Sequence, residues 1–199
     1  MNFFTHVKRS LPILFVSLLL ASCGSRTAAP EAVCQNRYWD GTVGTCLPGG
    51  WSPVTSETLR SRGVTEGVVV AFQKDKAESG QFPTVTVTKE QLPEGITSTA
   101  YSAASIRSVS TYPSYKVFST RTMKVDGSDV TLHVFSAQPL EGDPARRFYQ
   151  VSAVGPPHTG YTFTALTPLS VSDALEKEIL VIMNNVTFVE QSSSSAASK

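Results

Sequence analysis

The 199-residue sequence predicts an α+β domain in which an antiparallel sheet of about six strands carries packed helices. Apolar and polar residues alternate in four runs between residues 116 and 167, as they do in strands with one buried face. Turn-forming residues separate these runs at short intervals, which favours an antiparallel meander. A stripe of apolar residues at helical spacing follows between residues 171 and 186, and it predicts a helix that lies across the sheet.

The first two runs of the meander form a predicted hairpin. Residues 116–124 lead into Val125-Asp126-Gly127-Ser128, and the alternation resumes over residues 130–135. An Asp-Gly step between alternating runs is a strong hairpin signal, because glycine accepts a positive φ. Residues 147–154 and 161–167 supply the third and fourth strands.

Further elements flank the meander. Residues 64–72, with a continuous apolar run from position 68, and residues 82–88 predict two earlier strands. A helix is expected over residues 97–110, with Thr97 or Ser98 as its N-cap, although its five serines lower the helix propensity. The final helix begins after Ser172, whose hydroxyl suits an N-cap.

The N-terminus has the pattern of an export signal. Two basic residues, Lys8 and Arg9, precede an apolar run over residues 11–21 that is too short to span a membrane but suits a signal peptide. The run ends in Leu20-Ala21-Ser22-Cys23, which resembles the lipobox of bacterial lipoproteins. The resemblance implies cleavage before Cys23, lipidation of its thiol and anchoring by acyl chains such as palmitate. An ordinary secretory signal is the alternative.

The charge balance excludes some classes of partner. Two of the 17 basic residues precede Cys23, so the processed chain keeps 15 basic against 16 acidic residues, a net charge of −1. It has no basic stripe interleaved with aromatic residues, which nucleic-acid binding requires. No nucleic-acid partner is therefore expected.

The three cysteines are predicted to have different chemical roles. With Cys23 assigned to the lipid, Cys34 and Cys46 remain in an oxidising compartment, which favours a disulfide between them. Metal binding is the rival interpretation, but two cysteines without a nearby histidine lack the usual ligands for zinc. No metal site is expected.

Three residues are candidates for binding. Tyr38 and Trp39 lie inside the disulfide loop, where they can form a recognition surface or pack on the adjoining domain, and packing is the simpler interpretation. His158 follows Pro156-Pro157 in a loop, where a histidine can bind a partner or remain solvated.

Catalytic motifs are not found. His133 and His158 are the only histidines after Cys23, and no Gly-x-Ser-x-Gly elbow accompanies them. His133 is interpreted as a surface or cross-strand pairing residue. Phosphate-binding glycine loops, dinucleotide motifs and calcium loops are also missing. The sequence therefore predicts a protein without catalytic residues or a cofactor.

The chain from Trp51 to Glu190 resembles the Mog1/PsbP-like α/β sandwich, particularly the small bacterial lipoproteins grouped with DcrB. The resemblance depends on the order of elements, on Gly50-Trp51, on Tyr-Thr-Phe-Thr-Ala at residues 161–165, and on Asn-Val-Thr-Phe at residues 185–188. The family tends to have Ser-Phe where this chain has Thr187-Phe188, and the disulfide segment has no counterpart in the family core. The resemblance implies a non-catalytic binding, assembly or envelope factor.

Five segments are expected: a signal peptide over residues 1–22, a tether over 23–33, a disulfide-closed segment over 34–50, the main domain over 51–190 and a disordered tail over 191–199. The expected function is that of a lipid-anchored envelope factor that holds a protein partner. Gly24 is compatible with an outer-membrane position facing the periplasm if the host has two membranes. The alternatives are a carrier with an apolar pocket for a small ligand between helix and sheet, and a hydrolase without a recognisable motif.

Overall fold

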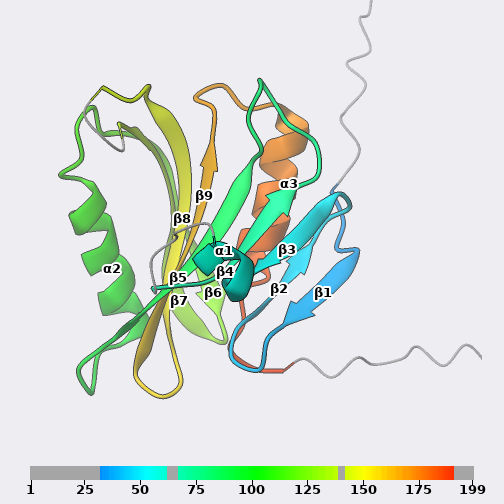
Figure 1. Cartoon of the computed structure of the whole chain (residues 1–199). Coiled ribbons are helices and arrows are strands. Elements are labelled where there is room, and N and C mark those ends of the chain that lie inside the picture. The colour runs from blue at the N-terminus through cyan, green and yellow to red at the C-terminus, as the bar shows by residue number, and fades with distance from the viewer. Residues whose placement is uncertain (1–31, 62–66, 139–141, 191–199) are drawn as a thin grey trace, which may run out of the picture.

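A computed structural model describes residues 32–61, 67–138 and 142–190 of the chain. Figure 1 shows a sheet with α2 on one face and α3 on the other, and the β1–β2 hairpin beside α3. The elements in chain order are β1 Asn36–Trp39, β2 Gly44–Leu47, β3 Trp51–Thr55, α1 Ser56–Ser61, β4 Val68–Lys74, β5 Thr84–Gln91, α2 Ser98–Val109, β6 Lys116–Val125, β7 Ser128–Ala137, β8 Arg146–Gly155, β9 Thr159–Thr167 and α3 Asp173–Asn184.

The main sheet is antiparallel and has the strand order β3-β4-β5-β9-β8-β7-β6. The predicted meander is confirmed, because β6, β7, β8 and β9 are neighbours in chain order. The hairpin turn is confirmed too: Asp126 and Gly127 have φ values of 45° and 85°, as a two-residue turn of type I′ requires. The α+β prediction is therefore correct, and β3 adds a seventh strand to the expected six.

The main core lies between α3 and the sheet. Ser172 caps α3 by accepting a hydrogen bond from the N–H of Leu175, as predicted. The apolar stripe of α3 packs on the odd-numbered residues of β8 and β9, including Tyr149, Val151 and Phe163. Ile179 and Ile182 are fully buried there, so α3 is held mainly by its apolar face.

The opposite face of the sheet holds a smaller apolar cluster of Val109, Phe135, Ala137 and Phe148, and short hydroxyl side chains join the rest of this face to α2. Thr97 caps α2 by accepting from the N–H of Ala100. The hydroxyls of Ser98 and Ser102 accept hydrogen bonds from the backbone of β8 and β7, and Ser105 pairs with Ser152. The serines that lower helix propensity thus bind the helix to the sheet.

Four elements were not predicted: β1, β2, β3 and α1. The disulfide segment forms the β1–β2 hairpin, and its Val43 and Leu47 belong to the same core as α3. The strand β3 pairs with β4 even though it contains Pro53, because it forms an edge of the sheet. The short helix α1 follows it.

Several expectations concern residues outside the described part of the chain. The signal peptide, Cys23 and most of the tether fall in residues 1–31, and the expected tail falls in residues 191–199. Among the residues that the structure describes, no helix has the length and apolar character needed to cross a membrane.

Candidate functional site

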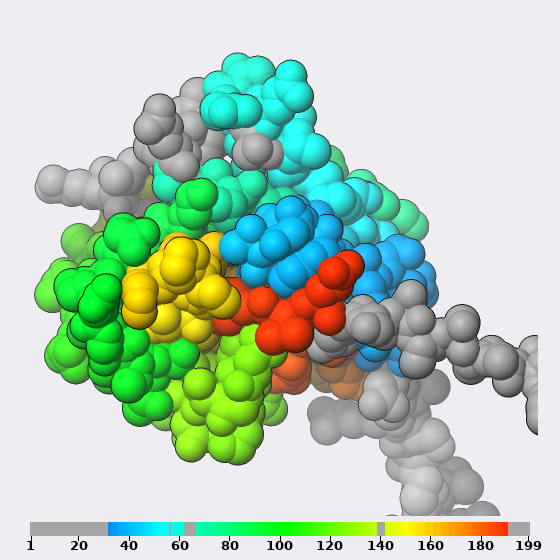
Figure 2. Space-filling view, turned by 90° about the horizontal axis from the view of Figure 1, so that it is seen from below, coloured from blue at the N-terminus to red at the C-terminus, as the bar shows by residue number. Residues whose placement is uncertain are grey.

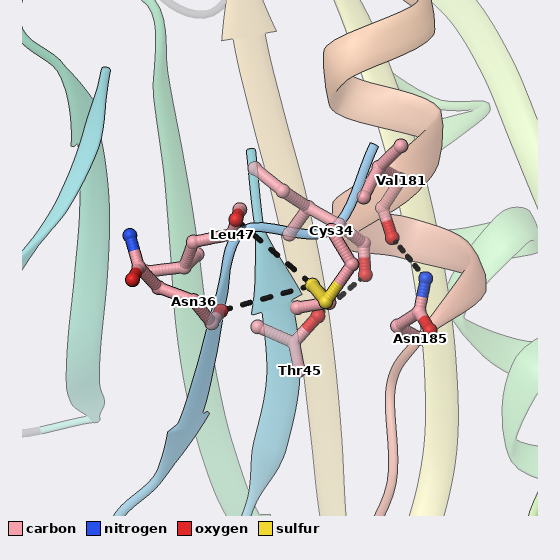
Figure 3. The surroundings of a disulfide bond; sticks show 8 residues. Cys34, Asn36, Thr45, Leu47, Val181 and Asn185 are labelled. Carbon is pink, nitrogen blue, oxygen red and sulfur yellow. Dashed lines mark hydrogen bonds between the residues drawn. A yellow bond between two sulfur atoms is a disulfide. The ribbon is translucent and has the colours of Figure 1, made fainter. Parts of the chain in front are cut away.

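The disulfide fixes one side of the candidate site. Cys34 and Cys46 are bonded, with 5.5 Å between their Cα atoms, so the predicted pairing is present. Figure 3 shows the bond beside the C-terminal end of α3, where the Asn185 side chain donates to the carbonyl of Val181. The hydroxyl of Thr45 donates to the carbonyl of Ile182. The hairpin is therefore attached to the last turn of α3.

Tyr38 packs on the main domain. Its ring meets the ring of Phe72 edge-on, with 4.9 Å between the centroids. Burial, with a further contribution from Asp40, raises the pKa of Tyr38 to about 12. This contact is the packing alternative that the sequence left open.

Trp39 lies over Gly44, which has no room for a side chain. A Cβ atom at Gly44 would lie 2.8 Å from Trp39 Cε3 and 2.9 Å from the Tyr38 carbonyl oxygen. Both aromatic residues, with Asn185 and Thr187, border a hollow of about 30 Å³. Ligand pockets usually exceed about 300 Å³, and one water needs about 10 to 15 Å³, so this hollow suits water rather than a metabolite.

The segment after α3 connects the hairpin to the meander. Gly44 and Thr187 exchange two backbone hydrogen bonds of 2.8 and 3.0 Å. Asp126, in the β6–β7 turn, accepts from the Thr187 hydroxyl and from the Phe188 N–H. Three parts of the chain that are distant in sequence are thus fixed together at one end of the molecule.

Figure 2 views this end directly. The yellow β8–β9 turn lies between the green segment that precedes α2 and the blue tip of the β1–β2 hairpin, with the red end of the described chain beside them. An open groove of about 410 Å³, here called the turn groove, lies between the hairpin tip, the end of β5 and the β8–β9 turn. It is lined by Thr42, Lys89, Glu90, Gln91, Pro156, Pro157, Thr159 and Tyr161.

His158 belongs to the turn that borders this groove. His158 is exposed, and its backbone has a φ of 52°. Its carbonyl accepts hydrogen bonds from the Leu92 N–H and the Gln91 side chain, at 2.9 and 3.2 Å. The backbone of the turn is therefore fixed to the end of β5, while the imidazole is available to solvent.

Tyr161 and Glu90 line the turn groove, and Tyr101 binds the Glu90 carboxylate. The Tyr101 hydroxyl donates to Glu90 over 2.7 Å, and burial, opposed by the Thr162 hydroxyl and assisted by Glu90, raises the pKa of Tyr101 to about 12. Burial and then Asp40 raise the pKa of Tyr161. Both phenols stay neutral, so the groove offers hydroxyls, one carboxylate and the exposed cation of Lys89.

Of the two interpretations of His133, the surface one is wrong, and the cross-strand one is correct because His133 pairs with Thr120 of β6 and Gln150 of β8. The side chain is 1% exposed, stacks on Phe135 and shares a 2.8 Å hydrogen bond between Nε2 and the Tyr115 hydroxyl. Burial lowers the pKa of His133, because the charged imidazolium is poorly solvated there. The turn after α2, which carries Tyr115, buries a residue that the strand pattern placed at the surface.

His133 and His158 lie in different parts of the molecule, one beneath α2 and one in the β8–β9 turn. Within the described residues, no group of three or more His, Cys, Asp or Glu side chains is placed to hold a metal ion. The turn groove offers a concave surface with hydroxyl and backbone groups, which can hydrogen-bond a partner.

Comparisons with known proteins found similarity at the level of structure. No protein-family model and no curated protein sequence matches the chain. LpqN, which is involved in cell envelope biogenesis of Mycobacterium tuberculosis, has a TM-score of 0.50 at 12% identity over 76% of this chain and 88% of its own. The Ran-binding protein Mog1p of Saccharomyces cerevisiae has a TM-score of 0.46 at 13% identity over 78% and 96%.

A Pseudomonas aeruginosa protein of unknown function has a TM-score of 0.41 at 12% identity, over 67% of this chain and 82% of its own. At such identities the comparisons concern the fold alone. The LpqN likeness, the antiparallel sheet and the helices on its two faces show that this chain has the Mog1/PsbP-like α+β fold.

Proposed function

We propose that this chain is a lipid-anchored, non-catalytic factor of the bacterial cell envelope that holds a protein partner at the turn groove. The observation that carries the proposal is the contrast between a filled interior and an open end. Ile179, Ile182 and Phe163 in the core between α3 and the sheet are at most 1% exposed. The turn groove is formed by the β8–β9 turn and the hairpin tip, which hydrogen bonds fix in place. Binding residues commonly lie on loops that a rigid scaffold positions.

The packed interior weighs against a carrier for an apolar ligand. Such a carrier needs a cavity between helix and sheet, where this chain has buried side chains such as Ile179, Ile182 and Phe163. A small polar ligand remains the second candidate, since the 410 Å³ of the turn groove falls within the usual range of ligand sites.

The anchor part of the proposal depends on the lipobox-like residues that end in Cys23. The likeness in fold to LpqN, a protein of cell envelope biogenesis, supports an envelope location. In cells, wild type should incorporate labelled palmitate and accumulate as precursor under globomycin, whereas Cys23→Ser should not be labelled. Unlabelled wild type with globomycin-insensitive processing would instead support an ordinary secretory signal.

A pull-down tests the binding part. The partner is captured from crosslinked whole cells with the tagged full-length protein, with a double Thr42→Arg, Pro157→Arg variant and with a Phe82→Arg control. Thr42 and Pro157 are exposed residues of the turn groove, and Phe82 is an exposed residue before β5, at the opposite end of the sheet. We expect the double variant to lose the partner and the control to retain it.

The same preparations are assayed with a panel of hydrolase substrates. We expect no turnover above a buffer control. Reproducible turnover that is lost on changing His133 or His158 would replace the proposal with an enzyme. Retention of a small molecule by wild type and not by the double variant would replace it with a carrier.

A further inference from the structure

The strand β6 is the open edge of the main sheet. In the part of the chain that the structure describes, no other strand pairs with its outer side. Eight of its ten residues are exposed, while Met123 and Val125 pack against the core on the α3 face, so the outer edge of the strand is open. The opposite edge, β3, has only five residues, contains Pro53 and leads directly into α1. A long strand without proline at an edge is a ready template for another strand.

The turn at the end of β6 determines which backbone groups point outward. Asp126 and Gly127 form a two-residue turn, in which the flanking Val125 and Ser128 exchange both of their backbone hydrogen bonds. Along an antiparallel pair, residues that bond to the partner strand alternate with residues that do not. Thr120, Thr122 and Lys124 therefore direct their N–H and C=O groups away from β7.

A groove adjoins this edge on the α2 side of the sheet. It has a volume of about 250 Å³ and lies between α2, with Ala103 and Ile106, and the strands β6 and β7, with Thr122 and Val130. An extended segment bonded to Thr122 would place alternate side chains over this groove, because side chains alternate between the faces of a strand. Backbone pairing and a side-chain site are thus available together.

The charges of β6 indicate what kind of segment fits. Lys116, Arg121 and Lys124 are basic and exposed, and the strand contains no acidic residue. Lys124 is paired with Asp129 of β7 and Arg121 donates to the neutral Asn184, so three cations and one acid leave this edge a net charge of +2. Pairing of β6 with a second copy would bring two edges of net positive charge to one seam, which is unfavourable since like charges across strands repel. The basic edge is complementary to an acidic strand.

We propose that the outer edge of β6, between the bulge at Phe118 and the turn at Asp126, accepts an extended acidic segment of another protein as an additional strand. The edge lies apart from the turn groove, so this surface is a second docking site and does not depend on the proposed function. Backbone hydrogen bonds at Thr120, Thr122 and Lys124 supply the affinity, and the alternate side chains over the α2 groove supply specificity.

The probe is a ten-residue peptide that alternates Val with Thr and carries three Glu residues, titrated into the full processed protein. Thr122→Pro removes the outward N–H without breaking the β6–β7 ladder, and Thr122→Ala is the matched control that keeps this N–H. We expect Thr122→Pro to weaken binding about tenfold or more and Thr122→Ala to stay within about twofold. Lys124→Glu should weaken binding as well.

A second probe keeps the proposal falsifiable if Thr122→Pro does not fold. The same peptide, N-methylated at alternate amides, has the same charge and side chains but cannot pair with the edge, so it should not bind wild type. Absence of binding by the unmodified peptide, equal binding by the N-methylated peptide, or equal binding by a Lys-for-Glu peptide would overturn the proposal. If wild type self-associates and Thr122→Pro abolishes this self-association, the strand that pairs with β6 comes from a second copy of this chain and not from an acidic partner. None of these results bears on whether the turn groove captures a protein partner, so either proposal can be wrong while the other is correct.

Discussion

The carboxylate of Asp126 accepts a hydrogen bond from the backbone N–H of Phe188, with 2.6 Å between Oδ2 and N. Its Oδ1 accepts from the Thr187 hydroxyl, and Thr187 is paired with Gly44. One side chain in the β6–β7 turn therefore connects the meander, the segment after α3 and the disulfide hairpin.

Replacement of Asp126 should loosen this connection. Asp126→Ala leaves the Phe188 N–H without its partner, and we expect the free energy of unfolding to fall by about 1 to 2 kcal/mol in urea titrations. The control is Asp129→Ala in the same hairpin, which removes an exposed ion pair with Lys124 and should change stability by less than about 1 kcal/mol. Equal effects of the two variants would show that the Asp126 contacts add nothing.

The disulfide should stabilise the fold through the loop it closes. The bonded cysteines are 12 residues apart, and closing a loop of this size contributes about 3 kcal/mol in the chain-entropy model. Mass mapping of the unreduced protein should find Cys34 and Cys46 in one linked species. Unfolding measured with and without reductant should differ by about that amount; two freely alkylatable thiols in the native protein would contradict the pairing.

Packing of α3 can be tested within the helix itself. Ile179 is fully buried, and truncation to alanine should lower the free energy of unfolding by about 2 to 5 kcal/mol. Val181 on the same helix is only partly buried, so Val181→Ala should cost less than about 1 kcal/mol. Similar losses for both would mean that the helix does not present the Ile179 face to the sheet.

Titration of the buried His133 should make the stability of the fold depend on pH. Its folded-state pKa is lowered by burial, whereas the unfolded chain titrates near the ordinary value of about 6.5. The unfolded state therefore binds the proton more readily, and stability present above pH 6.5 is lost as the pH falls below it. His133→Gln keeps a partner for the Tyr115 hydroxyl without titrating, so its stability should change less between pH 7.5 and pH 5.5. Parallel pH profiles for both proteins would exclude His133 as the cause.

The sequence predicted the meander and α3 because their signals are local. Alternation, the Asp126-Gly127 turn and the Ser172 cap depend on neighbours in the chain, and these elements appear close to their expected bounds. The strands β1, β2 and β3 have four or five residues each, too few for a clear alternation, and β3 contains Pro53. β1 and β2 are strands because they pair with each other, and β3 because it pairs with β4, which an apolar pattern alone does not reveal.

The candidate site was less predictable because its residues come from distant parts of the chain. Tyr38 and His158 were recognised as candidates, but the turn groove arises where β5, the β8–β9 turn and the hairpin tip meet. The two contacts of Asp126 join residues about 60 positions apart, which no local pattern reveals. The burial of His133 likewise comes from Tyr115, at the far end of a loop.

Site-specific photocrosslinking in cells tests the proposed partner site most directly. A photoreactive residue is placed at Pro157, in the turn groove, or at Phe82, which is also exposed but lies at the other end of the sheet. We predict a discrete crosslinked envelope protein from position 157 and none from position 82. Equal crosslinking from both positions, or none from position 157 with the protein correctly exported, would contradict a partner site at the turn groove.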